Sequence, residues 1–237
     1  GSYASSGTYV TGLAAKNAAT ELCEKICVKA AQMWDVDAAD VVFDGQYVRL
    51  SDERAAREQN RYLTLRDFAN LCVKNIEGGD ALTSHASACL PVSPPPFMAG
   101  IAEVEVDKAT GKVTVVDYAA AVDCGTVINE ALARVQAEGG IAQGIGHALY
   151  EIVEHDERGR LRTGNFMSYK LPTRLDIGSI RVAFEPSYEP TGPFGAKSIG
   201  EVVINTPLAA VASAVAHATG HQVRSLPITP EKALLGE

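Results

Sequence analysis

Four glycines interrupt a stretch of the chain that otherwise has the pattern of a single helix. In residues 128–153 the apolar side chains recur at helical spacing, but the stretch also contains Gly139, Gly140, Gly144 and Gly146. Each glycine inside a helix costs about 1 kcal/mol relative to alanine. The fold must therefore give these glycines a purpose other than helix stability, such as the close approach of another backbone or of a ligand.

Two further segments are also rich in small residues. One is GSYASSGTY at residues 1–9 and the other is GPFGAKSIGEVV at residues 192–203, while the interrupted helix contributes QAEGGIAQGIG at residues 136–146. Successive exposed backbone amides can bind an anion without a charged side chain. Three such segments favour one large anionic ligand, whereas turns or tight helix packing would explain any one of them alone.

Periodicity, capping residues and turn residues predict the remaining elements. We expect helices over residues 13–34, 64–77 and 205–220, with Thr64 as an N-cap, and a short last helix that begins at residues 229–230. Hairpins are predicted over residues 41–50 and 102–122, and another strand over residues 179–186. The SPPPF segment at residues 93–97 is a connector, because prolines remove backbone donors. Hairpins and helices follow one another in no strict order, so the predicted fold class is α+β.

Composition and charge exclude several functions. A chain of 237 residues, 46% of them hydrophobic, can bury a substantial core, and a net charge of -8 argues against nucleic acid as a partner. The apolar runs are shorter than the roughly 18 residues of a membrane span, and no leader pattern is visible, so a cytoplasmic location follows by default. Five cysteines without a CxxC pair favour reduced thiols and argue against a zinc or iron-sulfur site within this chain.

Common nucleotide and hydrolase motifs fail on this sequence. Gly144 and Gly146 are followed by Leu149 where a dinucleotide fingerprint has its third glycine. In GPFGAKS, Ala196 separates the glycine from Lys197, so the triplet of a phosphate-binding loop is absent. No serine occupies a GxSxG turn, which removes the starting point for a hydrolase triad.

Taken together and in this order, the segments resemble the molybdenum hydroxylase family, whose members include xanthine dehydrogenase, aldehyde oxidase, nicotinate dehydrogenase and aerobic carbon monoxide dehydrogenase. The resemblance runs nearly end to end and rests on ASSGTYVTG, EVEVDKATGKVTVVDYAAAVDCGTVIN, QAEGGIAQGIGHALYE, MSYKLPT, GAKSIGE and LPITPEK. The chain is most similar to bacterial xanthine dehydrogenase-like subunits. The resemblance implies that residues 1–237 form the C-terminal molybdopterin-binding region of a large subunit, which is incomplete without an N-terminal molybdenum-binding part. A partner chain from a split gene would supply that part, or the chain is a cleaved or truncated product, and we favour a natural split or processed subunit.

The resemblance also implies roles for individual residues. Glu201 matches the family's catalytic base at the end of its G-[AVI]-G-E signature, and Gln136 matches the glutamine that binds the pterin cofactor. The other cofactor-binding residues that it implies are Ala4, Ser5, Ser6, Gly7, Lys197, Ser198, Ile199 and Gly200. The chain departs from the family pattern in two places. Val202 and Val203 stand where the family usually has Pro-Pro, and Glu130 stands where it usually has the proline of Ile-Asn-Pro.

The implied activity is oxidative hydroxylation of an electron-poor carbon with water, on a purine or another N-heterocycle. The implied cofactor is molybdopterin with molybdenum, with the cytosine dinucleotide as one form, while FAD and 2Fe-2S clusters would lie on partner subunits. The implied partners are the other molybdopterin-binding chain, an iron-sulfur subunit, an FAD subunit and a small-molecule substrate, with no nucleic acid and no membrane. The alternatives are an aldehyde- or carbon monoxide-oxidising member of the same family and a non-catalytic assembly subunit.

Overall fold

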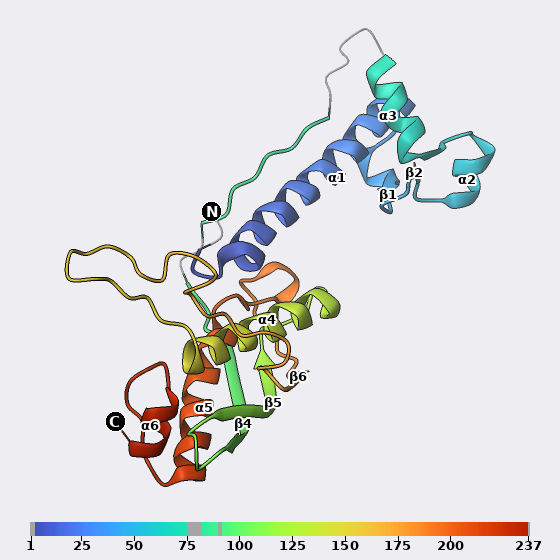
Figure 1. Cartoon of the computed structure of the whole chain (residues 1–237). Coiled ribbons are helices and arrows are strands. Elements are labelled where there is room, and N and C mark those ends of the chain that lie inside the picture. The colour runs from blue at the N-terminus through green and yellow to red at the C-terminus, as the bar shows by residue number, and fades with distance from the viewer. Residues whose placement is uncertain (1–2, 75–81, 90–91, 237) are drawn as a thin grey trace. The chain divides into compact units, whose positions relative to one another are not determined.

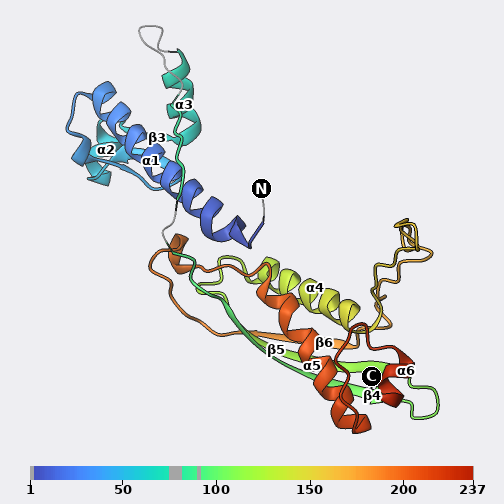
Figure 2. The ribbon, with the colours of Figure 1, turned by 90° about the vertical axis from the view of Figure 1, so that its left-hand side faces the viewer.

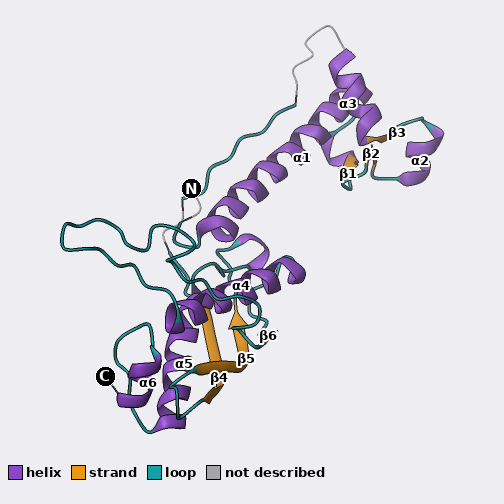
Figure 3. Ribbon diagram, in the orientation of Figure 1, coloured by secondary structure: helices purple, strands orange, loops and turns teal. Residues whose placement is uncertain are grey.

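The chain folds into two compact units. The computed structural model describes residues 3–74, 82–89 and 92–236. The smaller unit is Thr11–Cys89, and the larger unit combines Gly1–Val10 with Leu90–Glu237. The backbone therefore leaves the larger unit, forms the whole smaller unit and then returns (Figure 1). Each unit contains a sheet and helices, which confirms the α+β class (Figure 3).

The smaller unit is a three-stranded sheet with helices. Its elements are α1 (Gly12–Trp34), β1 (Val41–Phe43), β2 (Tyr47–Leu50), α2 (Glu53–Glu58), β3 (Tyr62–Thr64) and α3 (Leu65–Lys74). The strands are antiparallel in the order β1-β2-β3. Its core consists of Ile26, Ala30, Ala31, Val41, Val48, Leu50, Ala56, Phe68 and Cys72.

The predictions for the smaller unit are largely confirmed. Asp44 accepts backbone N–H bonds from Gln46 and Tyr47 and so forms the expected turn between β1 and β2. The hydroxyl oxygen of Thr64 accepts the N–H of Asp67 and so caps α3 as expected. The predicted end of this helix, at residue 77, lies outside the described residues. Both α2 and β3 were not predicted, because each is too short to show a period.

The larger unit is a three-stranded sheet with two long helices on one face. Its elements are β4 (Phe97–Val106), β5 (Val113–Asp123), α4 (Glu130–Leu149), β6 (Ser179–Phe184), α5 (Val202–Thr219) and α6 (Pro230–Leu235), with a 3-10 turn at Pro193–Gly195. The predicted hairpin forms the antiparallel pair β4-β5, and β6 pairs with β5 in parallel after the chain crosses over through α4. The prediction of a strand at residues 179–186 is therefore confirmed.

One face of the β4-β5-β6 sheet carries the core of the larger unit. Along β5, Val113 and Val115 are buried before a bulge, and Tyr118, Ala120 and Val122 are buried after it. Burial therefore alternates on each side of the bulge, as expected for a sheet with one covered face. Helices α4 and α5 pack on each other and on the sheet from this side (Figure 2). This core fixes the first turn of α5 and the middle of α4 relative to the end of β5.

The glycines of α4 allow α5 to pack unusually close. A Cβ atom on Gly140 would come within 2.4 Å of Val203, and one on Gly144 within 2.8 Å of the carbonyl oxygen of Ile204. By contrast, a Cβ atom on Gly139 would meet nothing within 4 Å. The expectation that this segment offers free amides to a ligand is therefore wrong for Gly140 and Gly144, since they lie inside a continuous helix whose amides bond to their own backbone.

Helix α5 begins earlier than the sequence suggests. It was expected to start at residues 205–207, but it begins at Val202, with Glu201 in the N-cap position and Pro207 inside the helix. The β-branched residues at its start are poor helix formers, but Val203 is fully buried against α4, and packing overrides propensity. By length and composition alone, α5 could also cross a membrane, but it packs against α4 and β4 in this unit.

Candidate functional site

Backbone contacts bind the loop before α5 to the end of β5. The N–H of Lys197 donates to the carbonyl oxygen of Cys124 at 2.7 Å, and the N–H of Thr126 donates to that of Gly195 at 2.8 Å. Gly125 has φ +71° between these bonds, and a Cβ atom there would come within 2.4 Å of the Gly195 carbonyl oxygen. A glycine is therefore required at position 125 for the loop and the strand end to touch.

The ammonium group of Lys197 is neutralised inside the larger unit. Lys197 is 8% exposed, and its Nζ lies 2.6 Å from Oδ2 of Asp123 and 5.3 Å from the ring centroid of Phe97. The other oxygen of Asp123 accepts hydrogen bonds from the Ser187 hydroxyl at 2.5 Å and the Gly125 N–H at 3.0 Å. Burial acts to raise the pKa of Asp123, but the bonds from Lys197, Ser187 and Gly125 outweigh it and hold that pKa below its ordinary value.

The carboxylate of Glu201 has a different environment. Its side chain is exposed, and its Oε2 accepts a hydrogen bond from the Ser5 hydroxyl at 3.0 Å. The same hydroxyl oxygen accepts the backbone N–H of Glu201 at 2.8 Å. Ala4 and Ser5 have φ of 50° and 54°, a left-handed conformation that residues with a side chain seldom adopt. A strained turn therefore brings Ser5 onto the residue at the start of α5.

Gln136 of α4 is hydrogen-bonded to the residue directly before Glu201. Its side-chain Nε2 donates to the carbonyl oxygen of Gly200 at 3.4 Å, and its side chain is exposed. The first turn of α4 is fixed by Asn129, whose side-chain oxygen accepts the N–H of Leu132 at 3.0 Å. Gln136 lies one turn further along this helix, so the N-cap helps to set its position.

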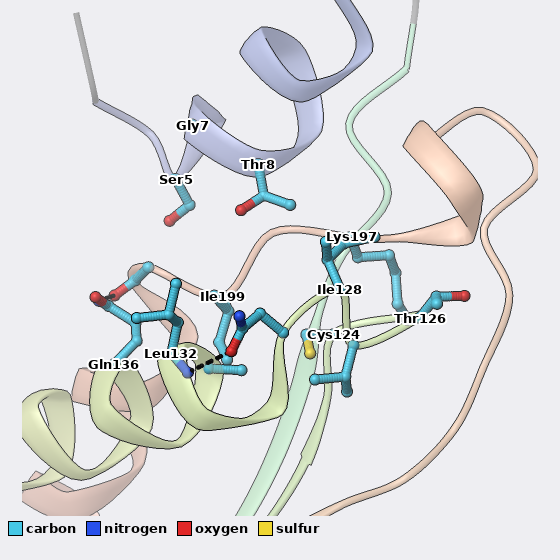
Figure 4. Close-up of a pocket in the computed structure, with 14 residues that line it drawn as sticks. Ser5, Gly7, Thr8, Cys124, Thr126, Ile128, Leu132, Gln136, Lys197 and Ile199 are labelled. Carbon is cyan, nitrogen blue, oxygen red and sulfur yellow. Dashed lines mark hydrogen bonds between the residues drawn. The ribbon is translucent and has the colours of Figure 1, made fainter. Parts of the chain in front are cut away.

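These segments surround a pocket of about 390 Å³ in the larger unit. Figure 4 shows Ser5, Gly7 and Thr8 facing Leu132 and Gln136 of α4, with Cys124, Thr126 and Lys197 at the end of β5. The full lining is Ser5, Gly7, Thr8, Cys124, Thr126, Val127, Ile128, Asn129, Leu132, Ala133, Gln136, Lys197, Ile199 and Gly200. A second depression of about 420 Å³, between α4 and the segment of Arg174 to Ile180, contains none of the predicted site residues.

The thiol of Cys124 is part of the pocket wall. Burial raises its pKa, and the neighbouring carboxylate of Asp123 raises it further. The neutral thiol is thus favoured, and Cys124 contributes a small apolar surface rather than a nucleophile.

The structure brings most of the sequence-predicted site residues together. Ser5, Gly7, Gln136, Lys197, Ile199 and Gly200 line the pocket. Ala4, Ser6, Ser198 and Glu201 adjoin these residues in sequence without lining the pocket, and Glu201 contacts it through Ser5. The roles of all these residues in cofactor binding and catalysis remain predictions.

Sequence reasoning missed part of the site. The strand end at Asp123 and Cys124 and the N-cap at Asn129 were not selected, although a polar residue directly before a helix is a recognisable signal. Ser187 and Phe97 lie far away in sequence and carry no local motif, so only the fold could reveal their contacts with the ion pair.

The chain is similar to known proteins over almost its whole length. Residues 1–178 match the molybdopterin cofactor-binding domain family. The chain is 36% identical over 235 residues to the probable hypoxanthine oxidase XdhD of Escherichia coli K12, which covers 99% of this chain and 24% of that protein. It is 34% identical over 233 residues to the putative xanthine dehydrogenase molybdenum-binding subunit XdhA of the same strain, with 98% of this chain and 30% of that protein covered.

A solved structure is also similar to the chain over almost its whole length. Quinoline 2-oxidoreductase from Pseudomonas putida 86 matches with a TM-score of 0.79 and 30% sequence identity, over 99% of this chain and 30% of that chain. The chain therefore spans 24 to 30% of the length of these relatives.

Proposed function

Because the chain belongs to the molybdopterin cofactor-binding domain family of xanthine dehydrogenase-like molybdenum hydroxylases, we propose that it is part of an enzyme that hydroxylates an electron-poor carbon with oxygen from water. One observation carries this proposal. Segments as far apart as Ser5, Gln136 and Gly200 line a single pocket, and the carboxylate of Glu201 is hydrogen-bonded to Ser5 of its wall. Since the chain spans only 24 to 30% of its relatives, we expect the activity to require further polypeptide.

The residues of the pocket fit a molybdopterin. Gln136 offers an amide with two donors and one acceptor, and Thr8 offers a hydroxyl, for the polar edge of a pterin. Gly7 presents backbone without a Cβ atom, so a flat ring system can approach it closely. When bound, the cofactor would supply a metal that takes up two electrons and activates water.

Within this site Glu201 would act as the general base. One carboxylate oxygen is bonded to Ser5, while Oε1 makes no hydrogen bond within the part of the chain that the structure describes. We propose that Oε1 accepts the proton of the water that supplies the hydroxyl oxygen. A positioned general base typically contributes 10²- to 10⁴-fold to the rate.

Lys197 would have a different role. Its ammonium is bonded to Asp123, so we infer that it supports the site by fixing the loop whose residues Ile199 and Gly200 line the pocket.

We also propose a substrate class and partner subunits for this enzyme. A purine or another N-heterocycle fits relatives that are named for hypoxanthine and quinoline, and aldehyde or carbon monoxide oxidation is the alternative. We further propose that the cofactor is the cytosine dinucleotide form. The electron acceptors would be an iron-sulfur subunit and an FAD subunit. The complex would also contain a second molybdopterin-binding chain, and its location would be the cytoplasm.

The decisive experiment is Glu201→Gln in the assembled enzyme. We expect turnover of hypoxanthine or quinoline to fall 10²- to 10⁴-fold while the molybdenum and pterin contents stay at the wild-type level. Glu105→Gln, a change at an exposed position of β4, is the matched control and should leave turnover unchanged.

Two results would overturn the proposal. Active material that contains neither molybdenum nor pterin would exclude the cofactor. A Glu201→Gln enzyme with full cofactor and unchanged turnover would favour the alternative of a non-catalytic assembly subunit.

A further inference from the structure

The hydroxyl of Ser5 forms a closed ring of two hydrogen bonds with one residue. It accepts the backbone N–H of Glu201 at 2.8 Å and donates to Oε2 of the same residue at 3.0 Å. The direction of each bond is fixed, because an amide N–H can only donate and an ionised carboxylate can only accept. The single proton of this hydroxyl is therefore committed to Glu201.

This ring selects one conformation of the carboxylate. Glu201 is the N-cap residue of α5, but its side chain makes no capping bond to the free N–H groups of the first turn. Those N–H groups and the positive end of the helix dipole attract a carboxylate. Without Ser5 the side chain would be free to fold back onto its own helix and away from the pocket.

The backbone around Ser5 is shaped for this contact. Ala4 and Ser5 both have positive φ, which is unfavourable for residues with a Cβ atom and persists only where surrounding contacts enforce it. A Cβ atom on Gly200 would lie 3.1 Å from the Ser5 hydroxyl oxygen, so glycine leaves room for the hydroxyl beside Glu201.

From these contacts we propose that Ser5 is a positioning residue that holds the carboxylate of Glu201 in its working orientation. The sequence resemblance implies cofactor binding for Ser5, whereas its hydrogen bonds to Glu201 give the hydroxyl a different role. This role rests on the proposed function, in which Glu201 is the general base.

The test uses the assembled enzyme with Ser5→Ala and Ser5→Gly. Glycine adopts the left-handed conformation freely, so Ser5→Gly removes the hydroxyl without straining the turn. We expect both variants to lose roughly ten-fold or more in kcat, as for a lost hydrogen bond to a charged group, with unchanged molybdenum and pterin contents. Ser213→Ala, a change at an exposed position of α5, is the matched control.

A double variant separates positioning from binding. In the Glu201→Gln background, Ser5→Ala should cause no further loss of kcat, because the group through which Ser5 acts has already been removed. Losses that multiply in the double variant, or a loss of pterin in Ser5→Ala that matches its loss of rate, would overturn the inference.

Hydrogen exchange gives a readout that does not depend on activity. The amide of Glu201 loses its acceptor in Ser5→Ala, so a peptide that contains this amide should exchange faster than in the wild type, and an unchanged exchange rate would contradict the inference. A fully active Ser5→Ala enzyme beside an inactive Glu201→Gln enzyme would overturn this inference alone. A fully active Glu201→Gln enzyme would remove the proposed function as well.

Discussion

Two charged residues four positions apart, Lys197 and Glu201, stand at opposite ends of one loop and have opposite environments. Lys197 is buried, with a carboxylate at 2.6 Å and an aromatic ring beneath its ammonium group. Glu201 is exposed, and its carboxylate has one hydroxyl partner within the residues described by the structure. The loop therefore carries one charge that is compensated and one that is available.

The difference separates a charge that holds the fold from a charge that can react. A buried charge is tolerated only with a partner, and removal of that partner leaves a large desolvation cost. An exposed carboxylate has no desolvation cost of this kind, and one of its oxygens stays available to accept a proton. We therefore expect substitutions at the Lys197 end to reduce stability and substitutions at the Glu201 end to reduce activity.

The largest expected effect on stability is that of Lys197→Met. This change leaves the carboxylate of Asp123, which is 23% exposed, without its counterion, and we expect the free energy of unfolding to fall by about 3 kcal/mol in denaturant titrations. Glu201→Gln should change the same quantity by less than about 0.5 kcal/mol. The double variant Lys197→Met with Asp123→Leu should recover most of the loss, because both charges are then absent. Equal losses at Lys197 and Glu201 would remove the distinction between the two ends.

A smaller effect on stability is expected from changes in the packing of α4 against the first turn of α5, next to Glu201. Gly144→Ala places a methyl group against the backbone of Ile204, and we expect a loss of about 1–3 kcal/mol in the free energy of unfolding. Gly139→Ala, in the same helix but with open space around it, should instead stabilise by up to about 1 kcal/mol. Similar effects of the two changes would show that close contact with α5 does not set the position of Glu201.

The smallest expected change in the free energy of unfolding is the one caused by mild acidification. The pKa of Asp123 is lower in the folded chain than in the unfolded chain, where it is about 3.9. Its contribution to stability is therefore complete above about pH 5 and is lost as the pH falls toward the folded-state pKa. The difference in unfolding free energy between the wild type and the Lys197→Met, Asp123→Leu variant should shift in favour of the variant between pH 5 and pH 3. A difference that stays constant over this range would contradict the prediction.

Local patterns predicted most of the elements around the site. The β4-β5 hairpin follows from the alternation along β4, the turn residues after it and the apolar run of β5, and α4 follows from its helical period. The start of α5 could not be predicted, because Val202, Val203 and Ile204 favour strands and become helical only through contact with α4. For the same reason, sequence could not distinguish a glycine that faces a ligand from Gly140, which faces another helix.

For the site itself, the sequence predicted residues but not contacts. The resemblance selected Ser5, Gln136 and Glu201, which the fold brings together. It also selected Lys197 without indicating that Asp123 holds its ammonium group. Such pairings depend on the strand end and the loop meeting through Gly125, which no local signal encodes.

The route of the backbone has a consequence for synthesis on the ribosome. Residues 11–89 are contiguous and have a core of their own, so they can fold soon after they are translated. The turn at Ser5, in contrast, meets its partner only after 196 more residues have been added, a delay of roughly 10 to 40 s at typical translation rates. During that interval the turn lacks the hydrogen bonds that hold it, and the mature geometry around Glu201 is completed only after Glu201 itself has been synthesised.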